Sequence, residues 1–215
     1  MKIEKIRARS ISVPLNQPFR TSLSNITSKD HIVVEITTDE GICGVGEIGP
    51  LPEFSGESGE SGRTVVDRLL APAIIGQDAF EIESLMENLD LAVKGNNLAK
   101  SAVDFALHDI VGKALSVPAC QLLGGFYRDS IRLAWAMGMK EPKKMADEAL
   151  NAVREGYTTL KLKVGTDPGK DLERIRAVRE AVGPDIGIRA DANQGYSPAI
   201  AIKVIRKFEV FDLQY

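Results

Sequence analysis

The chain has 215 residues, of which 44% are hydrophobic and 27% are charged, and its formal net charge is −3. This length allows one large domain or two small ones, and the composition is that of a soluble globular protein. The slightly negative charge argues against a surface for nucleic acid. The N-terminus does not read as a signal peptide and no apolar run could span a membrane, so we expect neither a nucleic acid nor a membrane as partner.

Several common functional sites are disfavoured. The two cysteines, Cys43 and Cys120, lie far apart without metal-ligand spacing, which favours reduced thiols and a cytoplasmic location. His31 and His108 pair with no serine or cysteine in a recognised catalytic spacing. The run Gly44-Val45-Gly46 is too short for a phosphate loop and falls in a predicted hairpin, which argues against a dinucleotide site.

The N-terminal part predicts an antiparallel meander. Residues 3–14 alternate apolar and polar side chains, which predicts a strand that ends at Pro14. Residues 31–38 and 42–48 predict two more strands, joined by a turn at Asp39-Glu40-Gly41.

Loops and helices complete this part of the chain. Residues 15–30 are polar and predict an irregular segment, and residues 49–62 predict a loop rich in Gly, Ser, Pro and Glu. Phe54 lies in that loop, and an apolar side chain on a mobile loop often covers a ligand. From about residue 63 to 117 the apolar period is helical, and Pro118 ends the last helix.

Beyond residue 130, apolar strands alternate with helical patterns. The strands are expected at residues 131–139, 158–165 and 186–193, with a fourth beginning at 211–215. A proline opens each helix, at Pro142, Pro168 and Pro198. This alternation predicts a parallel sheet with right-handed crossovers. A closed barrel of eight units needs roughly 250 residues, so the chain is either part of a longer protein or forms an open sheet of another kind.

The run Lys161-Leu162-Lys163 places two ammonium groups on one face of a predicted strand. Taken alone, such a strand more often faces water. Here Leu160 and Val164 share the other face with Leu162, which suits the helix-facing side of a parallel strand. The lysines would then point into the interior or mouth of a barrel, where two cations need an anionic partner. A lysine beside another cation loses basicity and can act as a base near neutral pH.

The run Asp191-Ala192-Asn193 follows the next apolar strand. These residue types also favour a turn. However, the carboxyl end of a parallel strand is where sites are built, and a hard divalent cation prefers carboxylate ligands. One carboxylate does not make a magnesium site, and no second clear candidate follows Asp191. A lysine base close to a bound metal ion suggests enolate chemistry.

Taken together, these motifs resemble the muconate-lactonizing-enzyme branch of the mandelate racemase/muconate lactonizing enzyme family, in the enolase superfamily. The likeness runs over the whole chain. Ala102 to Lys113 and Pro118 to Gly125 are similar to the helix and the Leu-Leu-Gly-Gly ending of the family's capping domain. The lysine pair and the Asp-Ala-Asn run are similar to its second-strand and third-strand motifs. The implied fold is an α+β capping domain, residues 1–125, followed by the first part of a (β/α) TIM-like barrel, residues 126–215.

The resemblance also implies roles for these residues. Lys163 corresponds to the general base, and Lys161 to the companion that lowers its basicity and faces the substrate carboxylate. Asp191 corresponds to the first magnesium ligand, and Asn193 lies beside the metal and the substrate. A lysine base with magnesium is a known arrangement in enolase-superfamily sites.

Substrate contacts are expected from three more places. The segment 15–30, with Phe19, and the loop around Phe54 are similar to two capping-domain loops that close over substrate. We also expect a contribution from the strand of Trp135. The family carries two further acidic metal ligands and an opposing lysine on later strands, and Phe211 to Tyr215 is similar to the fourth strand just before its acid.

The implied function of the complete protein is that of a magnesium-dependent isomerase. It would act on the proton alpha to the carboxylate of a small substrate, as a racemase or epimerase or as a cycloisomerase. A dehydratase of the same superfamily is an alternative. If the chain truly ends at residue 215, a non-catalytic scaffold or binding protein is another. For this fold we expect a homo-oligomer.

Overall fold

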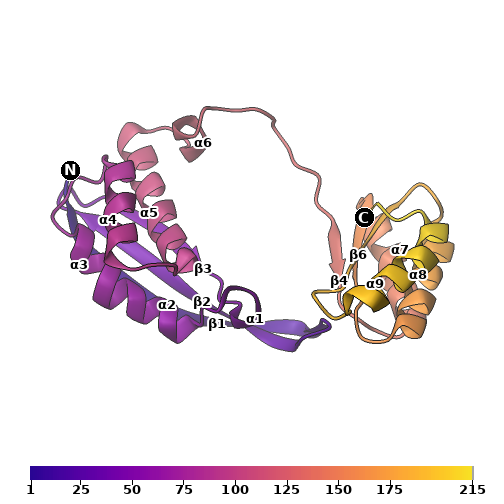
Figure 1. Ribbon diagram of the computed structural model, residues 1–215. Helices are drawn as coiled ribbons and strands as arrows, with labels where there is room; N and C mark the ends of the chain where they lie inside the picture. The colour runs from indigo at the N-terminus through magenta and orange to yellow at the C-terminus, as the bar shows by residue number, and fades with distance from the viewer. Residues whose placement is uncertain (215) are drawn as a thin grey trace. The chain divides into compact units, whose positions relative to one another are not determined.

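The computed structural model describes residues 1–214, and Tyr215 lies outside the described residues. Contacts within the chain divide it into two compact units (Figure 1). The first unit contains Met1–Pro14 and Ser28–Asp129, and the second contains Leu15–Thr27 and the residues from Ser130 onward. The segment Leu15–Thr27 therefore belongs to a different unit from the segments that flank it.

The first unit contains an antiparallel sheet. Its strands are β1 (Ile3–Arg20), β2 (Asn25–Thr38) and β3 (Cys43–Ile48), in the order β1-β2-β3. β2 and β3 are antiparallel, with Ile32 opposite Ile48. The predicted meander is confirmed, and Ile32, Val34 and Ile36 of β2 lie with Ile48 of β3 in a buried core.

The prediction that the first strand ends at Pro14 is wrong. β1 continues to Arg20, and β2 already begins at Asn25, so most of the predicted irregular segment 15–30 is strand. β1 is an edge strand, and an edge strand tolerates the missing N–H of a proline. In addition, Met139 N donates to Arg20 O over 2.9 Å, a bond that local sequence does not reveal.

The helices of the first unit follow one another in the sequence, with short connections between them, from Pro52 to Leu122. They are α1 (Pro52–Ser55), α2 (Gly59–Val65), the π-helical turn η1 (Val66–Leu70), α3 (Ala71–Ile74), α4 (Ile82–Ala92), α5 (Asn97–Leu115) and α6 (Ala119–Leu122). The predicted loop 49–62 therefore contains α1 and the start of α2. Ser58 and Ser61 form a reciprocal capping box at the start of α2. The usual pattern has Glu or Gln in place of Ser61, so a search for that pattern would miss this helix start.

The two glycines of β3 allow α5 to pack closely on the sheet. A Cβ atom at Gly46 would lie 1.8 Å from Ala102 O, and one at Gly44 would lie 2.1 Å from Ala106 O. Neither distance is possible for a real side chain, so the Gly44-Val45-Gly46 run serves helix–sheet packing.

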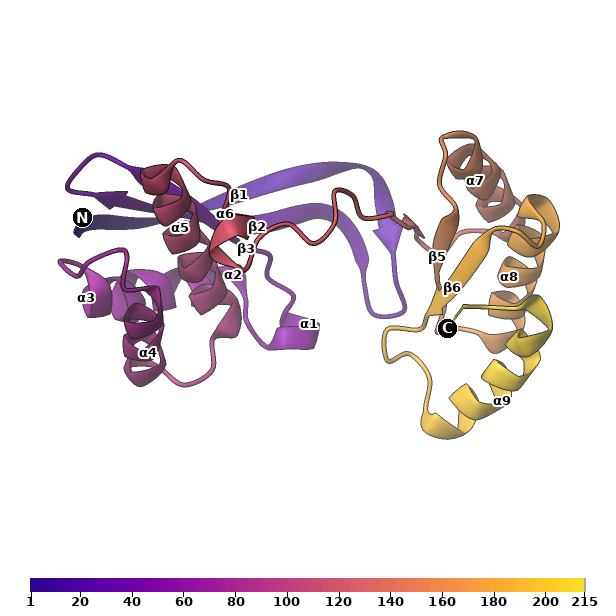
Figure 2. The same cartoon turned by 90° about the horizontal axis from the view of Figure 1, so that it is seen from above.

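The second unit contains three parallel βα units. They are β4 (Trp135–Met137), α7 (Pro142–Arg154), β5 (Thr159–Lys163), α8 (Pro168–Val182), β6 (Gly187–Asp191) and α9 (Pro198–Phe208), followed by the 3-10 turn η2 (Glu209–Phe211). The sheet order is β4-β5-β6 and both pairings are parallel, as predicted. All three helices lie on one side of the sheet (Figure 2), and the core of this unit lies between them and the strands.

Two strand predictions in this unit need correction. β4 is shorter than the predicted 131–139, and Ile131 and Leu133 are 75% and 70% exposed. Residues from Glu209 form the turn η2, and no strand is assigned as far as Gln214. Nevertheless, Gln214 N donates to Ile188 O over 2.8 Å along the free edge of β6. The end of the predicted fourth strand, at Tyr215, lies outside the described residues.

Cys43 and Cys120 are both free thiols in the structure. Among residues 1–214, no helix combines the length and apolar character that crossing a membrane requires.

Candidate active site

The register of β5 and β6 brings the predicted catalytic residues together. Lys161 lies opposite Arg189, and Lys163 lies opposite Asp191. Directly opposed residues in a sheet point to the same face, so these four side chains share one face. The alternate residues of β5, Leu160 and Leu162, are fully buried on the helix side. The lysine face is therefore the face that the helices leave uncovered.

Both lysines contact the same carboxylate oxygen. Lys163 Nζ lies 2.7 Å from Asp191 Oδ2, and Lys161 Nζ lies 2.9 Å from the same atom. The other oxygen, Asp191 Oδ1, accepts a hydrogen bond of 3.0 Å from Asn193 N. The side chain of Lys163 is 11% exposed and that of Lys161 is 41% exposed. Lys163 is thus the more enclosed of the two amines.

Asp191 is the anionic partner of the two cations. Burial raises the pKa of Asp191, but hydrogen bonds from Lys161, from Lys163 and from Asn193 N outweigh it and lower the pKa to about 2. The carboxylate is therefore ionised at neutral pH. Three formal charges thus converge on one spot at the carboxyl ends of β5 and β6.

The segment after β6 is fixed by the tip of the β1–β2 hairpin. Ser22 Oγ donates to Ala192 O over 2.7 Å and lies 3.3 Å from Asn193 O. Asn193 has a left-handed backbone with φ of 44°. Its side-chain Oδ1 is buried and has no hydrogen-bond partner among residues 1–214. A buried acceptor without a donor is costly, and it is a point where a ligand could bind.

Two glycines let the loops after β5 and β6 meet backbone to backbone. Gly165 has φ of +112°, and a Cβ atom there would lie 2.5 Å from Ala192 O. A Cβ atom at Gly195 would lie 2.2 Å from Gly165 O. Any larger residue at either position would push the two loops apart.

The structure does not bring Trp135 to the lysine face. Trp135 is opposed to Leu160 in the register and therefore points toward the helices. Its Nε1 donates to Glu148 of α7 over 3.1 Å, and its ring packs edge-to-face on Tyr157. Trp135 is thus a partly buried residue that packs against the core of this unit and has a satisfied polar atom.

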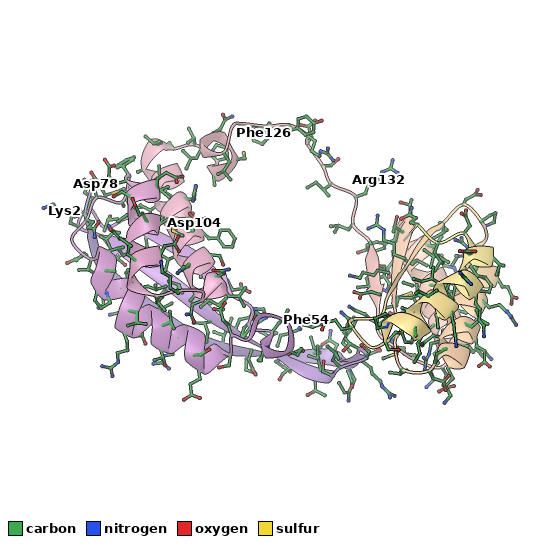
Figure 3. All side chains as sticks on the ribbon, in the orientation of Figure 1. Lys2, Phe54, Asp78, Asp104, Phe126 and Arg132 are labelled. Atoms are coloured by element: carbon green, nitrogen blue, oxygen red, sulfur yellow. The ribbon has the colours of Figure 1, made fainter. Side chains whose placement is uncertain are left out.

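The other two predicted substrate contacts lie in different units. Phe19 lies near the hairpin tip, where its ring would be 3.4 Å from a Cβ atom at Gly138 in the loop after β4. It is half-buried within the second unit. Phe54 lies on α1 of the first unit (Figure 3) and is 46% exposed. A substrate contact by either residue stays a prediction.

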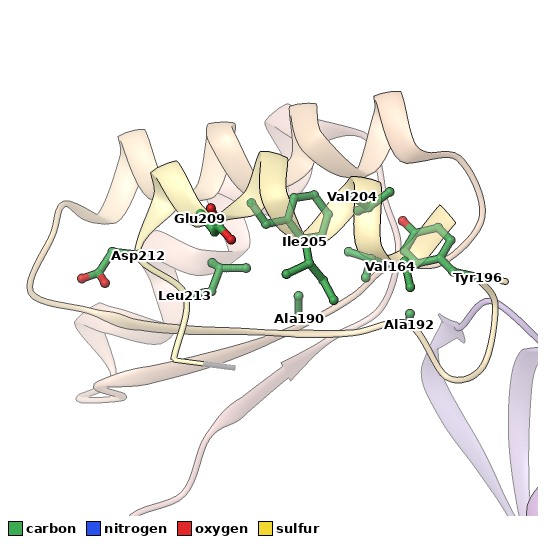
Figure 4. Close-up of a pocket in the computed structure, with 11 residues that line it drawn as sticks. Val164, Ala190, Ala192, Tyr196, Val204, Ile205, Glu209, Asp212 and Leu213 are labelled. Atoms are coloured by element: carbon green, nitrogen blue, oxygen red, sulfur yellow. The ribbon is translucent and has the colours of Figure 1, made fainter. Parts of the chain in front are cut away.

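An apolar groove of about 420 Å³ lies between β6 and α9 (Figure 4). It is lined by Val164, Ala190, Ala192, Tyr196, Ala201, Val204, Ile205, Phe208, Glu209, Asp212 and Leu213. Ala190 is opposed to Leu162 in the register, so the groove opens on the helix side of the sheet. The lysine pair faces the other side, and the groove is not the candidate active site.

The described residues supply part of a magnesium site. Asp191 gives an ionised carboxylate, and Asn193 gives a buried amide oxygen without a donor. Both are oxygen ligands of the kind that Mg²⁺ prefers. Within residues 1–214, however, no group of three or more His, Cys, Asp or Glu side chains could hold a metal ion. The chemistry of the donors fits magnesium, and their number is too small for a complete shell.

The sequence prediction missed a buried polar cluster next to this site. It consists of Asp171 and Arg174 of α8 and of Tyr196 in the loop after β6. A signal was present in the sequence, because Asp171 and Arg174 fall on the helical stripe that also carries Ile175 and Val178. Charged residues on an apolar stripe are unusual and indicate a buried ion pair.

Two family models match most of the chain. Residues 4–124 match the N-terminal domain of the mandelate racemase/muconate lactonizing enzyme family, and residues 144–215 match the enolase C-terminal domain-like family.

Individual relatives agree with this assignment. An N-succinyl-L-Arg/Lys racemase from Bacillus cereus is 41% identical over 196 residues, which are 91% of this chain and 53% of that protein. A crystal structure of N-succinyl Arg/Lys racemase from that species has a TM-score of 0.97 and 38% identity, and it covers 100% of this chain and 58% of its own. A dipeptide epimerase from Cytophaga hutchinsonii, complexed with Mg and the dipeptide D-Ala-L-Val, has a TM-score of 0.94 and 34% identity over 100% and 58%.

A chloromuconate cycloisomerase from Cupriavidus necator is 35% identical over 213 residues, which are 97% of this chain and 57% of that protein. The chain thus spans little more than half the length of the relatives it matches. The matched domains, these identities and the shared architecture lead to one conclusion: the chain belongs to the mandelate racemase/muconate lactonizing enzyme family of the enolase superfamily.

Proposed function

We propose that the whole protein is a magnesium-dependent isomerase that racemises or epimerises a small acid at the carbon alpha to its carboxylate. The observation that carries this proposal is the convergence of Lys161 and Lys163 on Asp191 Oδ2, at 2.9 and 2.7 Å. Lys163 is an amine shielded from solvent, and it lies beside a second cation, Lys161, and an ionised acid, Asp191. Proton abstraction next to a carboxylate needs such an arrangement.

Each residue of the site has a proposed role. Lys163, the more enclosed amine, removes or returns the α-proton. Lys161, the more exposed one, faces the substrate carboxylate and attracts its charge. In the structure Lys163 donates to Asp191, and the neutral amine could keep this hydrogen bond while its lone pair accepts the proton of the substrate. Magnesium held by Asp191, with Asn193 beside it, would stabilise the negative charge that develops at the substrate carboxylate.

The proposed scaffold for this chemistry is a (β/α) barrel of which the three parallel units are the first part. The bond from Gln214 N to Ile188 O supports this idea, because a further parallel strand beside β6 would make it. We further propose residues 1–125 as a capping domain and residues 126–215 as the start of the barrel. Phe19, on the hairpin segment that packs within the second unit, and Phe54, on α1 of the first unit, are further side chains that we propose to contact substrate.

The proposed substrate class is an N-acylated amino acid or a dipeptide with a free carboxylate. The support comes from the relatives, one a racemase of N-succinylated Arg and Lys and another an epimerase complexed with a dipeptide. In such a substrate the carboxylate lies next to the carbon that carries the exchanging proton, as the lysine pair requires.

The proposal is tested by incubating the whole protein in deuterated solvent with magnesium and a set of dipeptides and N-succinyl amino acids. We expect α-deuterium in at least one substrate. Lys163→Ala should reduce exchange from its side of the substrate by at least about a hundredfold. Lys170→Ala, which removes an exposed amine from α8, is the matched control and should exchange like the wild type. Exchange that survives Lys163→Ala unchanged would reject the base assignment.

A second candidate is cycloisomerisation, which the chloromuconate cycloisomerase relative favours. It would form or open a lactone ring beside the same carboxylate. Lactone formation from a muconate without α-exchange in any dipeptide would favour this candidate. Loss of water from a hydroxy acid would instead indicate a dehydratase, and no turnover of any acid would indicate a binding or scaffold protein.

A further inference from the structure

Asp171 is a fully buried carboxylate that binds the loop after β5. Its Oδ2 accepts hydrogen bonds from Gly165 N at 2.9 Å and from Thr166 N at 3.3 Å. Its Oδ1 accepts a bond of 2.6 Å from Arg174 Nη1, one turn further along α8. The side chain of Arg174 is itself only 8% exposed. The result is a buried ion pair with most of its polar atoms satisfied.

This ion pair connects the loops that follow all three strands of the second unit. Arg174 Nε donates to Lys140 O, in the loop after β4, over 2.8 Å. Asp171 holds Gly165 in the loop after β5. The hydroxyl of Tyr196, in the loop after β6, donates to Asp171 Oδ2. These loops lie at the end of the sheet that carries the lysine pair and Asp191.

Stability alone does not account for such a cluster. Removing two charges from water costs about as much as their attraction returns, and apolar residues of similar size often serve equally well. The ion pair makes directional hydrogen bonds that hold each loop in one position, and an apolar cluster would not do so. Burial and the neighbouring Asp171 also raise the pKa of Tyr196, so its hydroxyl stays protonated and remains a donor.

The loops after β5 and β6, which the Asp171 cluster binds, begin directly after site residues in the sequence. Gly165 follows Lys163 by two residues in the sequence. Val164 N, between them, donates to Asp191 O over 3.0 Å. A displacement of the loop after β5 or of the loop after β6 would therefore move Lys163 relative to Asp191. Displacements on the order of 1 Å can reduce the rate of an oriented reaction by about a hundredfold.

We propose that Asp171, held by Arg174 and Tyr196, is a positioning residue that fixes Lys163 and Asp191 in their reacting geometry. It does not touch the reacting atoms and acts through the loops after β4, β5 and β6. The inference rests on the proposed function, because it assigns these two residues to the reaction.

The first test is Tyr196→Phe in the whole protein. This change keeps the ring and the buried ion pair and removes the hydroxyl that connects the loop after β6. The matched control is Tyr157→Phe, which removes the same atom just before β5. Among residues 1–214 the hydroxyl of Tyr157 has no hydrogen-bond partner. Its ring packs on Trp135, and a phenylalanine ring can make the same contact.

Two measurements separate positioning from folding. For Tyr196→Phe we expect kcat to fall by at least about tenfold while KM stays within about twofold, because binding groups remain and only their alignment changes. We also expect the amide proton of Asn193 to exchange about tenfold faster with solvent, because its acceptor Asp191 Oδ1 is no longer held in place. Tyr157→Phe should match the wild type in both measurements.

A second variant, Asp171→Asn, removes the charge and keeps the shape. Where circular dichroism and a cooperative melt show it to be folded, its kcat should fall further than that of Tyr196→Phe, because the Gly165 and Thr166 amides lose their shared carboxylate. An unchanged kcat in Tyr196→Phe would overturn the inference. If the wild type turns over no acid, the proposed function fails. The inference is then judged by amide exchange, and wild-type exchange at Asn193 in Tyr196→Phe would overturn it.

Discussion

Lys163 and Asp191 are directly opposed in the parallel register of β5 and β6, and their charged atoms lie 2.7 Å apart. The pair is partly enclosed, with side-chain exposures of 11% and 25%. Its contribution to stability should therefore lie between that of an exposed pair and that of a buried one.

The first prediction concerns this pair. Asp191→Asn leaves Lys161 and Lys163 facing a neutral amide, so repulsion between the two ammonium groups is no longer compensated. We expect the free energy of unfolding at pH 7 to fall by about 1–3 kcal/mol. Urea denaturation measures this value, with Asp185→Asn, a change at an exposed turn, as the control. Equal stability of the two variants would contradict the prediction.

The second prediction concerns magnesium. A polypeptide of residues 1–215 should show no change in Tm on addition of about 10 mM Mg²⁺, because Asp191 and Asn193 are too few ligands for tight binding. The whole protein should be stabilised by magnesium in proportion to RT ln(1 + [Mg²⁺]/Kd). Differential scanning calorimetry compares the two. A magnesium-dependent rise in Tm for residues 1–215 would show that these residues already complete a site.

The third prediction concerns Glu57, a buried carboxylate that caps α5. Its Oε1 and Oε2 accept hydrogen bonds from Leu98 N at 2.9 Å and Ala99 N at 3.2 Å. Asn96, the residue at the N-cap position, makes no side-chain capping bond. Glu57→Ala leaves two amides at the start of α5 without a partner and should lower the free energy of unfolding by about 1–2 kcal/mol.

Chemical denaturation measures the effect of Glu57→Ala. Glu87→Ala, on an exposed position of α4, is the control and should change stability by less than about 0.5 kcal/mol. If both changes have the same small effect, Glu57 does not act as the cap.

The fourth prediction is a pH dependence that arises from Asp90 and Lys100. Their side chains are 2.7 Å apart, and Lys100 is only 7% exposed. The hydrogen bond from Lys100, and then its charge, lowers the pKa of Asp90 below the ordinary value of 3.8. A lowered native pKa stabilises the fold above 3.8, and this stabilisation is lost as the pH falls through the native value.

We therefore expect Asp90→Asn to have a lower Tm than the wild type at pH 7. The difference should shrink below pH 3.8, because the wild-type carboxylate is then neutralised as well. Thermal melts across this range measure it, with Asp147→Asn on the exposed face of α7 as the control. A difference in Tm that stays constant from pH 7 to pH 2 would count against the ion pair.

The fifth prediction concerns the packing of α5 on β3. In Gly46→Ala the new methyl group would overlap Ala102 O, which lies 1.8 Å from its ideal position. We expect a loss of at least about 2 kcal/mol in the free energy of unfolding, because the helix must move off the sheet. Gly49→Ala is the control, since the nearest atom there, of His31, lies at 3.7 Å. Similar stability of the two variants would mean that the interface yields easily.

Local patterns were sufficient to predict the three βα units. Pro168 and the Asp167 cap, which accepts from Gly169 N at 2.9 Å, mark the start of α8 as the sequence predicts. The pairing of Lys163 with Asp191 also follows from the pattern, because the strands alternate faces and adjacent parallel strands end at the same edge.

Features that depend on distant contacts could not be predicted in this way. β1 passes Pro14 and reaches Arg20, where the strand is held by Met139 N. The face of Trp135 depends on a register in which it meets Leu160, and the apolar run around it does not specify that register. The Asp171 cluster needs Tyr196, a residue 25 positions further along the chain.

The hairpin tip joins a segment from the N-terminal half of the chain to the loop after β6. Leu15–Thr27 lies far ahead in the sequence of the rest of its unit, which resumes at Ser130, and its Ser22 hydroxyl donates to the carbonyl of Ala192. A chimera that joins the first 129 residues of this protein to the remainder of a relative would transplant the tip into a foreign surface. Recombination at that junction would thus separate Ser22 from the loop it anchors, and successful hybrids should carry compensating changes around residue 192.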